Sequence, residues 1–288
     1  MLKAIADIDQ PKNGALYALG DVHGCFDALI ALEEKIKKSV KRSGRSCYKI
    51  ISVGDLCDRG PDTKKVIEHF VAGKLAGTHE LLLGNHEMFF IMAFVGLRPD
   101  LLERAGVQLA WYHQSLIHLY KAVTKQVESW RSNGGDSVFQ SYDADISDPG
   151  TWDQVPSSHL RLLFGAPLVA MTPTAIISHA VLHDGDLDAL RSCDHKSTDE
   201  NDKRLLEAVH RCLWERHFPA QRIDVSRRQI SGHTPVQVVR REPPLGVIQI
   251  DTGAVYGRTL TAINLRSFRT IGAPSNFQYR RIQRELYE

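Results

Sequence analysis

The chain has 288 residues, 43% hydrophobic and 24% charged, so its composition is that of a globular protein with a sizeable core. Its length allows one large α/β domain or two small ones. The net charge of +2 is too small to indicate a nucleic-acid or membrane partner, and no apolar run is long enough to cross a bilayer.

The first half alternates short apolar runs with amphipathic segments. Short apolar runs predict buried strands over 15–19, 48–53 and 80–83. Apolar residues at helical spacing predict helices over 26–40, 63–72 and 87–95. This β-α-β-α-β order predicts a largely parallel sheet flanked by helices.

The pattern changes after the middle of the chain. A long helix is predicted over 106–130, ending at the turn Asn133-Gly134-Gly135. Beyond it, short β-type runs predict a second, more antiparallel sheet from 168–171, 175–178, 229–232, 246–251 and 259–265. The polar stretch 184–203 is expected to be a surface excursion. No repeat or linker divides the chain, so we expect one catalytic domain over 15–266, with an N-terminal extension (1–14) and a basic C-terminal tail (267–288).

The cysteines and the N-terminus indicate the compartment. The five cysteines are odd in number and include no CxxC pair, which favours reduced thiols. Residues 1–10 lack an apolar secretory core, so no signal peptide is expected. We therefore expect a cytoplasmic protein.

Three predicted strands of the first half each lead into a polar loop punctuated by glycine. The loops are Gly20-Asp21-Val22-His23-Gly24, Gly54-Asp55-Leu56-Cys57-Asp58-Arg59-Gly60 and Gly84-Asn85-His86-Glu87. In open parallel sheets, ligands bind just beyond the carboxyl ends of the strands, where such loops converge. Asp21 and His23 are two residues apart, so in an extended segment both point to the same side.

Two strand-end histidines of the second half add to this donor set. One is His179, preferred over the nearby His183, and the other lies in Gly232-His233-Thr234-Pro235. The six candidate metal ligands are therefore Asp21, His23, Asp55, Asn85, His179 and His233. Carboxylate, imidazole and amide donors suit borderline-to-hard divalent ions. Six are too many for one tetrahedral ion and suit two ions that share a carboxylate.

The order of these motifs resembles a known family. The motifs are, in chain order, G-D-x-H-G, G-D-x-x-D-R-G, G-N-H-E, a later His-Ala and G-H-T-P. The second half of the chain also contains Trp214-Glu215-Arg216 and the segment 250–255. Over about residues 15–265 the chain resembles the phosphoprotein phosphatase family of calcineurin-like metallophosphoesterases, above all bacterial and phage serine/threonine phosphatases of the lambda phosphatase type. The resemblance implies an α/β fold, a four-layer α/β/β/α sandwich with a dinuclear metal site at the sheet edge.

The resemblance also implies a role for each motif residue. The first metal takes Asp21, His23 and Asp55. The second shares Asp55 and takes Asn85, His179 and His233. The catalytic residues are His86 as general acid, Asp58 to orient it, and Arg59 and Arg216 to hold phosphate oxygens. The expected cofactors are two divalent ions, manganese in vitro, with iron and zinc as alternatives.

Elementary chemistry supports these roles. Two divalent ions about 3.5–4 Å apart lower the pKa of a shared water enough to give hydroxide near neutral pH. After two carboxylates and the hydroxide are counted, the ions and two arginines still leave a positive field suited to a phosphate monoester dianion. A departing serine alkoxide needs a proton, which a cationic His86 would supply.

We therefore expect phosphomonoester hydrolysis on a phosphoprotein partner, with phosphoserine and phosphothreonine preferred over phosphotyrosine, and no nucleic-acid or membrane partner. The first alternative is hydrolysis of diadenosine tetraphosphate on the same scaffold. Those hydrolases usually carry Asp where this chain has Glu87, and they differ at Gly253-Ala254-Val255. The second alternative is an inactive phosphate-binding module, but such proteins normally lose ligands, and all six are present.

Other residues have structural explanations. Cys57 is expected to be a small buried residue rather than a redox sensor. Glu87 either accepts hydrogen bonds that orient the ligand loops or is simply an acid at a helix N-terminus. The turn 133–135 either lies near the substrate groove or simply ends a helix. Three histidines outside the motifs are expected at the surface: His69, His113 and His159.

Overall fold

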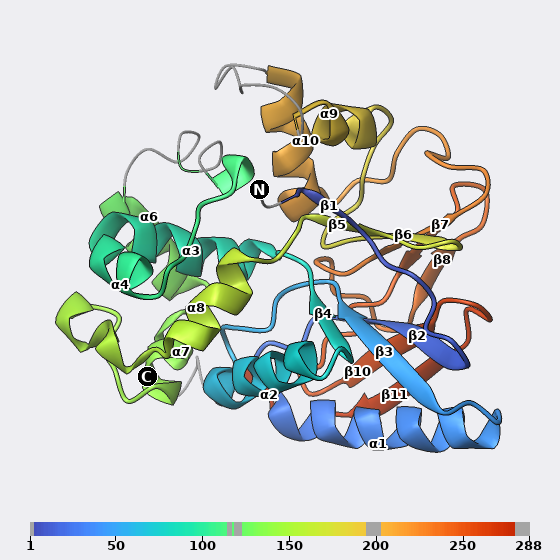
Figure 1. Cartoon of the computed structure of the whole chain (residues 1–288), viewed down its shortest axis with the longest axis horizontal. Helices are drawn as coiled ribbons and strands as arrows, with labels where there is room; N and C mark the ends of the chain where they lie inside the picture. Colours follow the sequence, from blue (N-terminus) through green and yellow to red (C-terminus); the bar gives the residue numbers. More distant parts are fainter. Residues whose placement is uncertain (1–2, 114–116, 118–122, 194–202, 280–288) are drawn as a thin grey trace.

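Two β-sheets, one of five strands and one of six, form the centre of the computed structural model. The structure describes residues 3–113, 117, 123–193 and 203–279. Between the sheets lies one apolar cluster, to which the first sheet contributes Leu16 and the second Ile177 and Ile230. Helices lie outside both sheets (Figure 1), so the expected four-layer sandwich is confirmed.

The first half of the chain builds the parallel part of the five-stranded sheet, as predicted. Its strands pair in parallel in the order β2 (Gly14–Leu19), β3 (Cys47–Ser52) and β4 (His79–Leu81). The helices of this half are α1 (Phe26–Arg42), α2 (Thr63–Leu75) and α3 (Asn85–Leu97). Helices α1 and α2 cover the outer face of this sheet, along the lower part of Figure 1.

Strand β2 shows why these strands are apolar without alternation. Leu16 and Ala18 belong to the cluster between the sheets, whereas Tyr17 and Leu19 belong to the cluster that includes the helices. Successive side chains of a strand point to opposite faces, so a strand in an inner layer of a sandwich buries both faces.

Of the helix predicted over 106–130, residues 111–113, 117 and 123–130 are helical, but the helix does not begin at 106. Gly106 adopts a positive φ of 65°, and residues 107–110 are irregular. A left-handed glycine ends a helix because the chain leaves the helical direction there. Helical structure is present again in α6 (Val123–Ser132). Two parts of the predicted helix, 114–116 and 118–122, lie outside the described residues.

Short helices follow α3 and lie at the left of Figure 1. Besides α6 they are α4 (Pro99–Arg104), α7 (Asp136–Ser141), the 3-10 helix η1 (Pro149–Gln154) and α8 (Ser157–Phe164). Aromatic rings join them, with centroids 5.7 Å apart for Phe90 and Trp130 and 4.6 Å for Phe139 and Trp152. We call residues 85–164 the helical region; it supplies residues to the site.

The second sheet mixes parallel and antiparallel pairs, whereas the sequence predicted a more antiparallel one. Its order is β1–β5–β6–β7–β9–β8. The strands from the second half are β5 (Val169–Met171), β6 (Ala175–Ser178), β7 (Arg228–Ser231), β8 (Arg240–Glu242) and β9 (Val247–Gln249). Strands β6, β7 and β9 pair in parallel. The predicted strand 259–265 is β10 (Thr259–Asn264), but it pairs with β2 in the other sheet.

Strands that lie outside the expected domain bounds of 15 and 266 belong to the two sheets. Strand β1 (Ile5–Asp7) pairs with β5, and β11 (Thr270–Pro274) pairs with β10. These edge strands are too short, or too rich in glycine and proline, to give a clear sequence pattern. Within the expected excursion lies α9 (Asp186–Cys193), followed by α10 (Lys203–Trp214). Residues 194–202 lie outside the described residues. Of the helices described, none combines the length and apolar character that a bilayer span requires.

Candidate metal centre

The six predicted ligands meet at the carboxyl ends of strands from both sheets. Asp21 and His23 follow β2, Asp55 follows β3, and Asn85 opens α3. The remaining two come from the six-stranded sheet, directly after β6 and β7: His179 and His233. All six side chains are buried. Residues up to 212 positions apart in the chain therefore share one site, as the loop pattern predicts.

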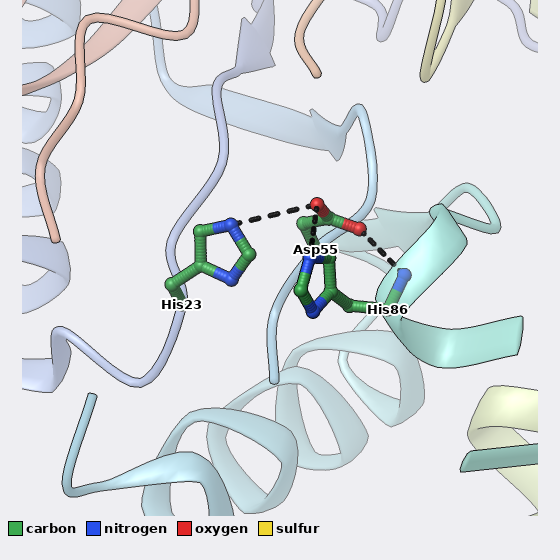
Figure 2. A group of neighbouring side chains, drawn as sticks. All are labelled: His23, Asp55 and His86. Atoms are coloured by element: carbon green, nitrogen blue, oxygen red, sulfur yellow. Dashed lines mark hydrogen bonds and ion pairs between the residues drawn. The ribbon is translucent and has the colours of Figure 1, made fainter. Parts of the chain in front are cut away.

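Asp55 lies at the centre of this arrangement. One oxygen of its carboxylate, Oδ2, is 3.5 Å from His23 Nε2 and 3.9 Å from His86 Nε2 (Figure 2). The same oxygen is 3.5 Å from His179 Nε2. The other oxygen, Oδ1, accepts a hydrogen bond of 3.1 Å from the backbone N–H of His86. A carboxylate with imidazoles on several sides has the position that a bridging ligand requires.

The other ligands form a second group beside Asp55. Asn85 Oδ1 lies 2.8 Å from His179 Nε2 and 3.0 Å from His233 Nδ1. Asp21 accepts the backbone N–H of His233 at 3.1 Å. His183, the alternative to His179, faces away, with its Nε2 3.2 Å from the carbonyl of His217. The structure thus places His179 rather than His183 in the site.

Backbone carbonyls fix the tautomer of two histidines. His23 Nδ1 lies 2.7 Å from the carbonyl oxygen of Cys57, and His179 Nδ1 lies 3.2 Å from that of Val53. A carbonyl only accepts, so each Nδ1 carries the proton and each Nε2 presents a lone pair. Metal-binding histidines commonly show this arrangement, because the outer hydrogen bond orients the ring and leaves the inner nitrogen to bind the ion.

Close backbone packing explains two of the glycines. A Cβ atom on Gly84 would lie 2.2 Å from Asp55 Oδ1, and one on Gly232 would lie 2.0 Å from Asp21 Oδ1. Positive φ angles occur at His23 (43°), Asp55 (54°) and His233 (65°). Such conformations cost energy for residues other than glycine and cluster at functional sites. The loops therefore hold their side chains in a fixed, strained geometry.

Burial shifts the protonation of the whole donor set toward neutral forms. It raises the pKa of Asp21, with Asp251 and Asp55 adding to the effect, and it raises the pKa of Asp55, where Glu87 adds to it. Burial lowers the pKa of His179, and it lowers that of His233 to about 3. Buried carboxylates close to one another favour a bound cation, and neutral imidazoles are free to ligate one. The donor set therefore fits a divalent metal site.

The His86 ring is held in one orientation, and burial, with the Arg59 charge adding to the effect, lowers its pKa. Its Nδ1 is hydrogen-bonded to Asp58 Oδ2, and Trp130 Nε1 donates to both oxygens of Asp58 at 2.8 Å. Asp58 and Trp130 are fully buried. The Asp58 carboxylate is thus fixed between an imidazole and an indole. Sequence reasoning identified Asp58 but missed Trp130, which lies in the helical region outside the motifs.

Arg59 joins the two sides of the site. Its guanidinium donates to His23 Nε2 at 2.7 Å and to His86 Nε2 at 2.8 Å. Its backbone N–H donates to the carbonyl of Gly134 at 3.0 Å, and a Cβ on Gly134 would lie 2.8 Å from Arg59 Cγ. The turn 133–135, for which two explanations were open, therefore supports an arginine of the site.

Arg216 lies at the edge of the site rather than within it. Its side chain is exposed, and it follows α10 by two residues. Its charge acts, after burial, to lower the pKa of His233. Arg216 is thus close enough to influence the centre electrostatically, and its exposed position leaves it free to meet an anion.

Both explanations offered for Glu87 hold, because it lies in the first turn of α3 and also accepts hydrogen bonds from the loop of Asp55. Its carboxylate accepts backbone N–H groups from Asp55 at 2.7 Å, Leu56 at 2.7 Å and Gly84 at 3.0 Å. It is fully buried. Cys57 is also fully buried, and burial raises the pKa of its thiol, as expected of a packing residue.

A Glu87→Gln variant should fold less stably and bind metal more weakly. The glutamine amide would place N–H donors against backbone N–H donors, and each buried group left unsatisfied costs about 1–3 kcal/mol. Thermal unfolding without metal and a Mn²⁺ titration would measure both effects. Glu34→Gln, at an exposed residue of α1, is the matched control. Unchanged stability and affinity would contradict this role for Glu87.

Asp251 is a further site residue that sequence reasoning placed in a motif but gave no role. Burial raises its pKa to about 6, and its charge raises the pKa of Asp21. Its Oδ1 accepts the backbone N–H of Gly253 at 2.9 Å.

Two of the histidines expected at the surface, His113 and His159, are buried, so that expectation was wrong for them.

Comparison with known proteins places this site in a family. The family described as calcineurin-like phosphoesterase matches residues 15–237, well over half of the chain. The chain belongs to this family. A calcineurin-like phosphoesterase is a metal-dependent hydrolase, and the aspartate and histidine clusters described above fit a metal site of this kind.

Curated relatives match over nearly their whole length at low identity. The asymmetrical bis(5'-nucleosyl)-tetraphosphatase PrpE of Anoxybacillus flavithermus is 24% identical over 275 residues, covering 91% of this chain and 94% of the relative. The symmetrical bis(5'-nucleosyl)-tetraphosphatase of Neisseria gonorrhoeae is 23% identical over 282 residues, covering 88% and 93%. Among solved structures, a protein serine/threonine phosphatase from Saccharomyces cerevisiae has a TM-score of 0.57 at 13% identity, covering 96% of this chain and 84% of that one. That likeness shows the shared fold.

Proposed function

We propose that the chain hydrolyses dinucleoside tetraphosphates at a dinuclear metal centre. The observation that supports this substrate is the near full-length match to bis(5'-nucleosyl)-tetraphosphatases from two bacteria. This substrate differs from the phosphoprotein expected from the sequence. We prefer it because the similarity to the tetraphosphatases extends beyond the motifs that they share with the protein phosphatases.

The ligand roles in this proposal are those that the family resemblance implies for the six residues. One ion would take Asp21, His23 and Asp55. The other would share Asp55 and take Asn85, His179 and His233. Bound divalent ions would polarise phosphoryl oxygens and make a hydroxide nucleophile available near neutral pH. Manganese is our first choice for assay in vitro, with iron and zinc as alternatives.

The remaining residues would act on the phosphate and the leaving group. Arg59 donates to His23 Nε2 and His86 Nε2. An ion bound at His23 Nε2 would release the guanidinium, which would then hold a phosphoryl oxygen as a planar donor. Arg216, at the exposed edge of the site, would contact the next phosphate group of the substrate's polyphosphate. His86, oriented by Asp58, would donate a proton to leaving groups that need one.

The second candidate is the phosphoserine and phosphothreonine phosphatase expected from the sequence. The buried Asp58–His86 pair favours it, because a serine alkoxide is a strong base whereas a nucleotide phosphate leaves without protonation. Glu87 also favours it, since the dinucleotide hydrolases usually carry aspartate there. The yeast phosphatase shares the fold but not enough sequence to argue for its substrate.

A direct comparison of substrates tests the proposal. With Mn²⁺ added, kcat/KM for diadenosine tetraphosphate should exceed that for a phosphoserine peptide by at least about tenfold, a difference of roughly 1.4 kcal/mol in activation free energy. Nucleotide products are read by chromatography and phosphate by a colorimetric assay. The reverse preference would support the protein phosphatase. Inactivity on both substrates and on p-nitrophenyl phosphate, with several metals, would indicate a binding module.

A further inference from the structure

A separate group of side chains that could bind a metal is formed by α1, α2 and strand β4 of the five-stranded sheet. It does not include any of the six ligands of the metal centre. Glu33 is in the middle of α1, His69 is on α2 and His79 begins β4. Glu33 and His79 are each 3% exposed. A buried carboxylate on a helix needs a specific partner, and this one has two imidazoles.

The three side chains converge on one carboxylate oxygen. Glu33 Oε1 is 3.0 Å from His79 Nε2 and 2.5 Å from His69 Nε2. The two imidazole rings have centroids 5.1 Å apart and are nearly perpendicular, at 83°. The ligand atoms of Glu33, His69 and His79 all lie within 4.8 Å of one another.

Outer hydrogen bonds hold two of these groups in place. Thr78 Oγ1 lies 2.9 Å from His79 Nδ1, and the Tyr48 hydroxyl donates to Glu33 Oε2 at 3.2 Å. Partners of this kind orient metal ligands in proteins. Binding of an ion would displace the Nε2 protons that His69 and His79 donate to Glu33.

We propose that Glu33, His69 and His79 form a separate site for one divalent transition-metal ion of the zinc class. Two histidines and one glutamate are a common three-ligand set for tetrahedral Zn²⁺, with water as the fourth ligand. The His69 side chain is 27% exposed and gives that water access. Ligand atoms about 2.0–2.1 Å from a tetrahedral ion lie roughly 3.3 Å apart, so the present contacts need to open by less than an ångström.

The position of this site gives it a structural role. It would join α1 and α2 to β4, the strand that leads into the loop with Asn85 and His86. α1 itself follows the loop that carries His23. The ion would thus brace two elements that bear ligands of the catalytic centre, without contact with the substrate.

Co²⁺ binding to the full-length protein tests this site. The Asp55→Asn substitution impairs the catalytic centre. Once a chelator has removed the metal from this variant, the Glu33–His69–His79 site should still bind one equivalent of Co²⁺, with the visible absorption of a tetrahedral complex. Adding His69→Ala should weaken that binding about 100-fold or more, since even loss of an outer partner costs about 10–100-fold. Adding Glu34→Gln instead, next to Glu33 but exposed, should leave it unchanged.

The outcomes separate a metal site from a plain hydrogen-bonded cluster. If one Co²⁺ remains but is unaffected by His69→Ala, the ion occupies the damaged catalytic centre and the proposal is wrong. If no Co²⁺ binds, the proposal is also wrong. His69 is partly exposed on α2, so His69→Ala should fold, and circular dichroism of each variant confirms that it does. None of these readouts depends on which substrate the enzyme hydrolyses.

Discussion

An Asp55→Asn variant should fail to bind the catalytic metal pair and should lose nearly all hydrolysis. The Asp55 carboxylate is the group that faces His23, His86 and His179 at once. Asparagine keeps the shape but removes the charge and one of the two acceptor oxygens. The loss in Mn²⁺ affinity should exceed the roughly 10–100-fold that a change outside the ligand shell costs.

Calorimetric Mn²⁺ titration, together with metal analysis of the purified variant, measures this effect. Asp27→Asn, at an exposed aspartate in the first turn of α1, is a control that changes the same chemical group away from the centre. Two ions bound by Asp55→Asn with wild-type affinity would show that Asp55 is not the shared ligand.

A His86→Asn variant should keep its metals and lose turnover selectively. The loss should reach about 10²–10⁴-fold on an alkyl phosphate such as phosphoserine, because the departing alkoxide needs a proton. It should be much smaller on p-nitrophenyl phosphate or a dinucleoside tetraphosphate, whose leaving groups are weak bases. The contact of His86 Nδ1 with Asp58 motivates this prediction.

The ratio of the losses on the three substrates is the measurement, with metal content determined for each sample. His210→Asn, at an exposed histidine of α10, is the matched control. Equal losses on all substrates, with metals retained, would argue that His86 positions the phosphate and does not donate a proton.

The inner strands and the metal loops could be predicted from the sequence because their signals are local. β2 is buried on both faces, so its residues are apolar in an unbroken run, and the glycines of the loops stand at fixed places beside the ligands. The resemblance then placed Asp55 between ligands from distant loops. The sheet to which β10 belongs could not be predicted, because pairing with β2 depends on contacts across most of the chain.

Other features of the site depend on contacts that leave no pattern in the sequence. Trp130 reaches Asp58 across 72 positions, and nothing near Trp130 distinguishes it from a core tryptophan. His69 and His79 resemble ordinary polar residues until α1 brings Glu33 between them. His113 and His159 were misplaced because a histidine in a helix carries no sign of which face is buried.

The contacts of the helical region limit which segments can be exchanged between this protein and its relatives. Trp130 holds Asp58, and Gly134 receives the backbone of Arg59, so this region and the second metal loop form one interlocked unit. A chimera that imports residues 85–164 from a relative without an equivalent indole and turn would keep every metal ligand of the recipient except Asn85. It would nevertheless leave Asp58 and Arg59 of the recipient without the contacts that Trp130 and Gly134 provide.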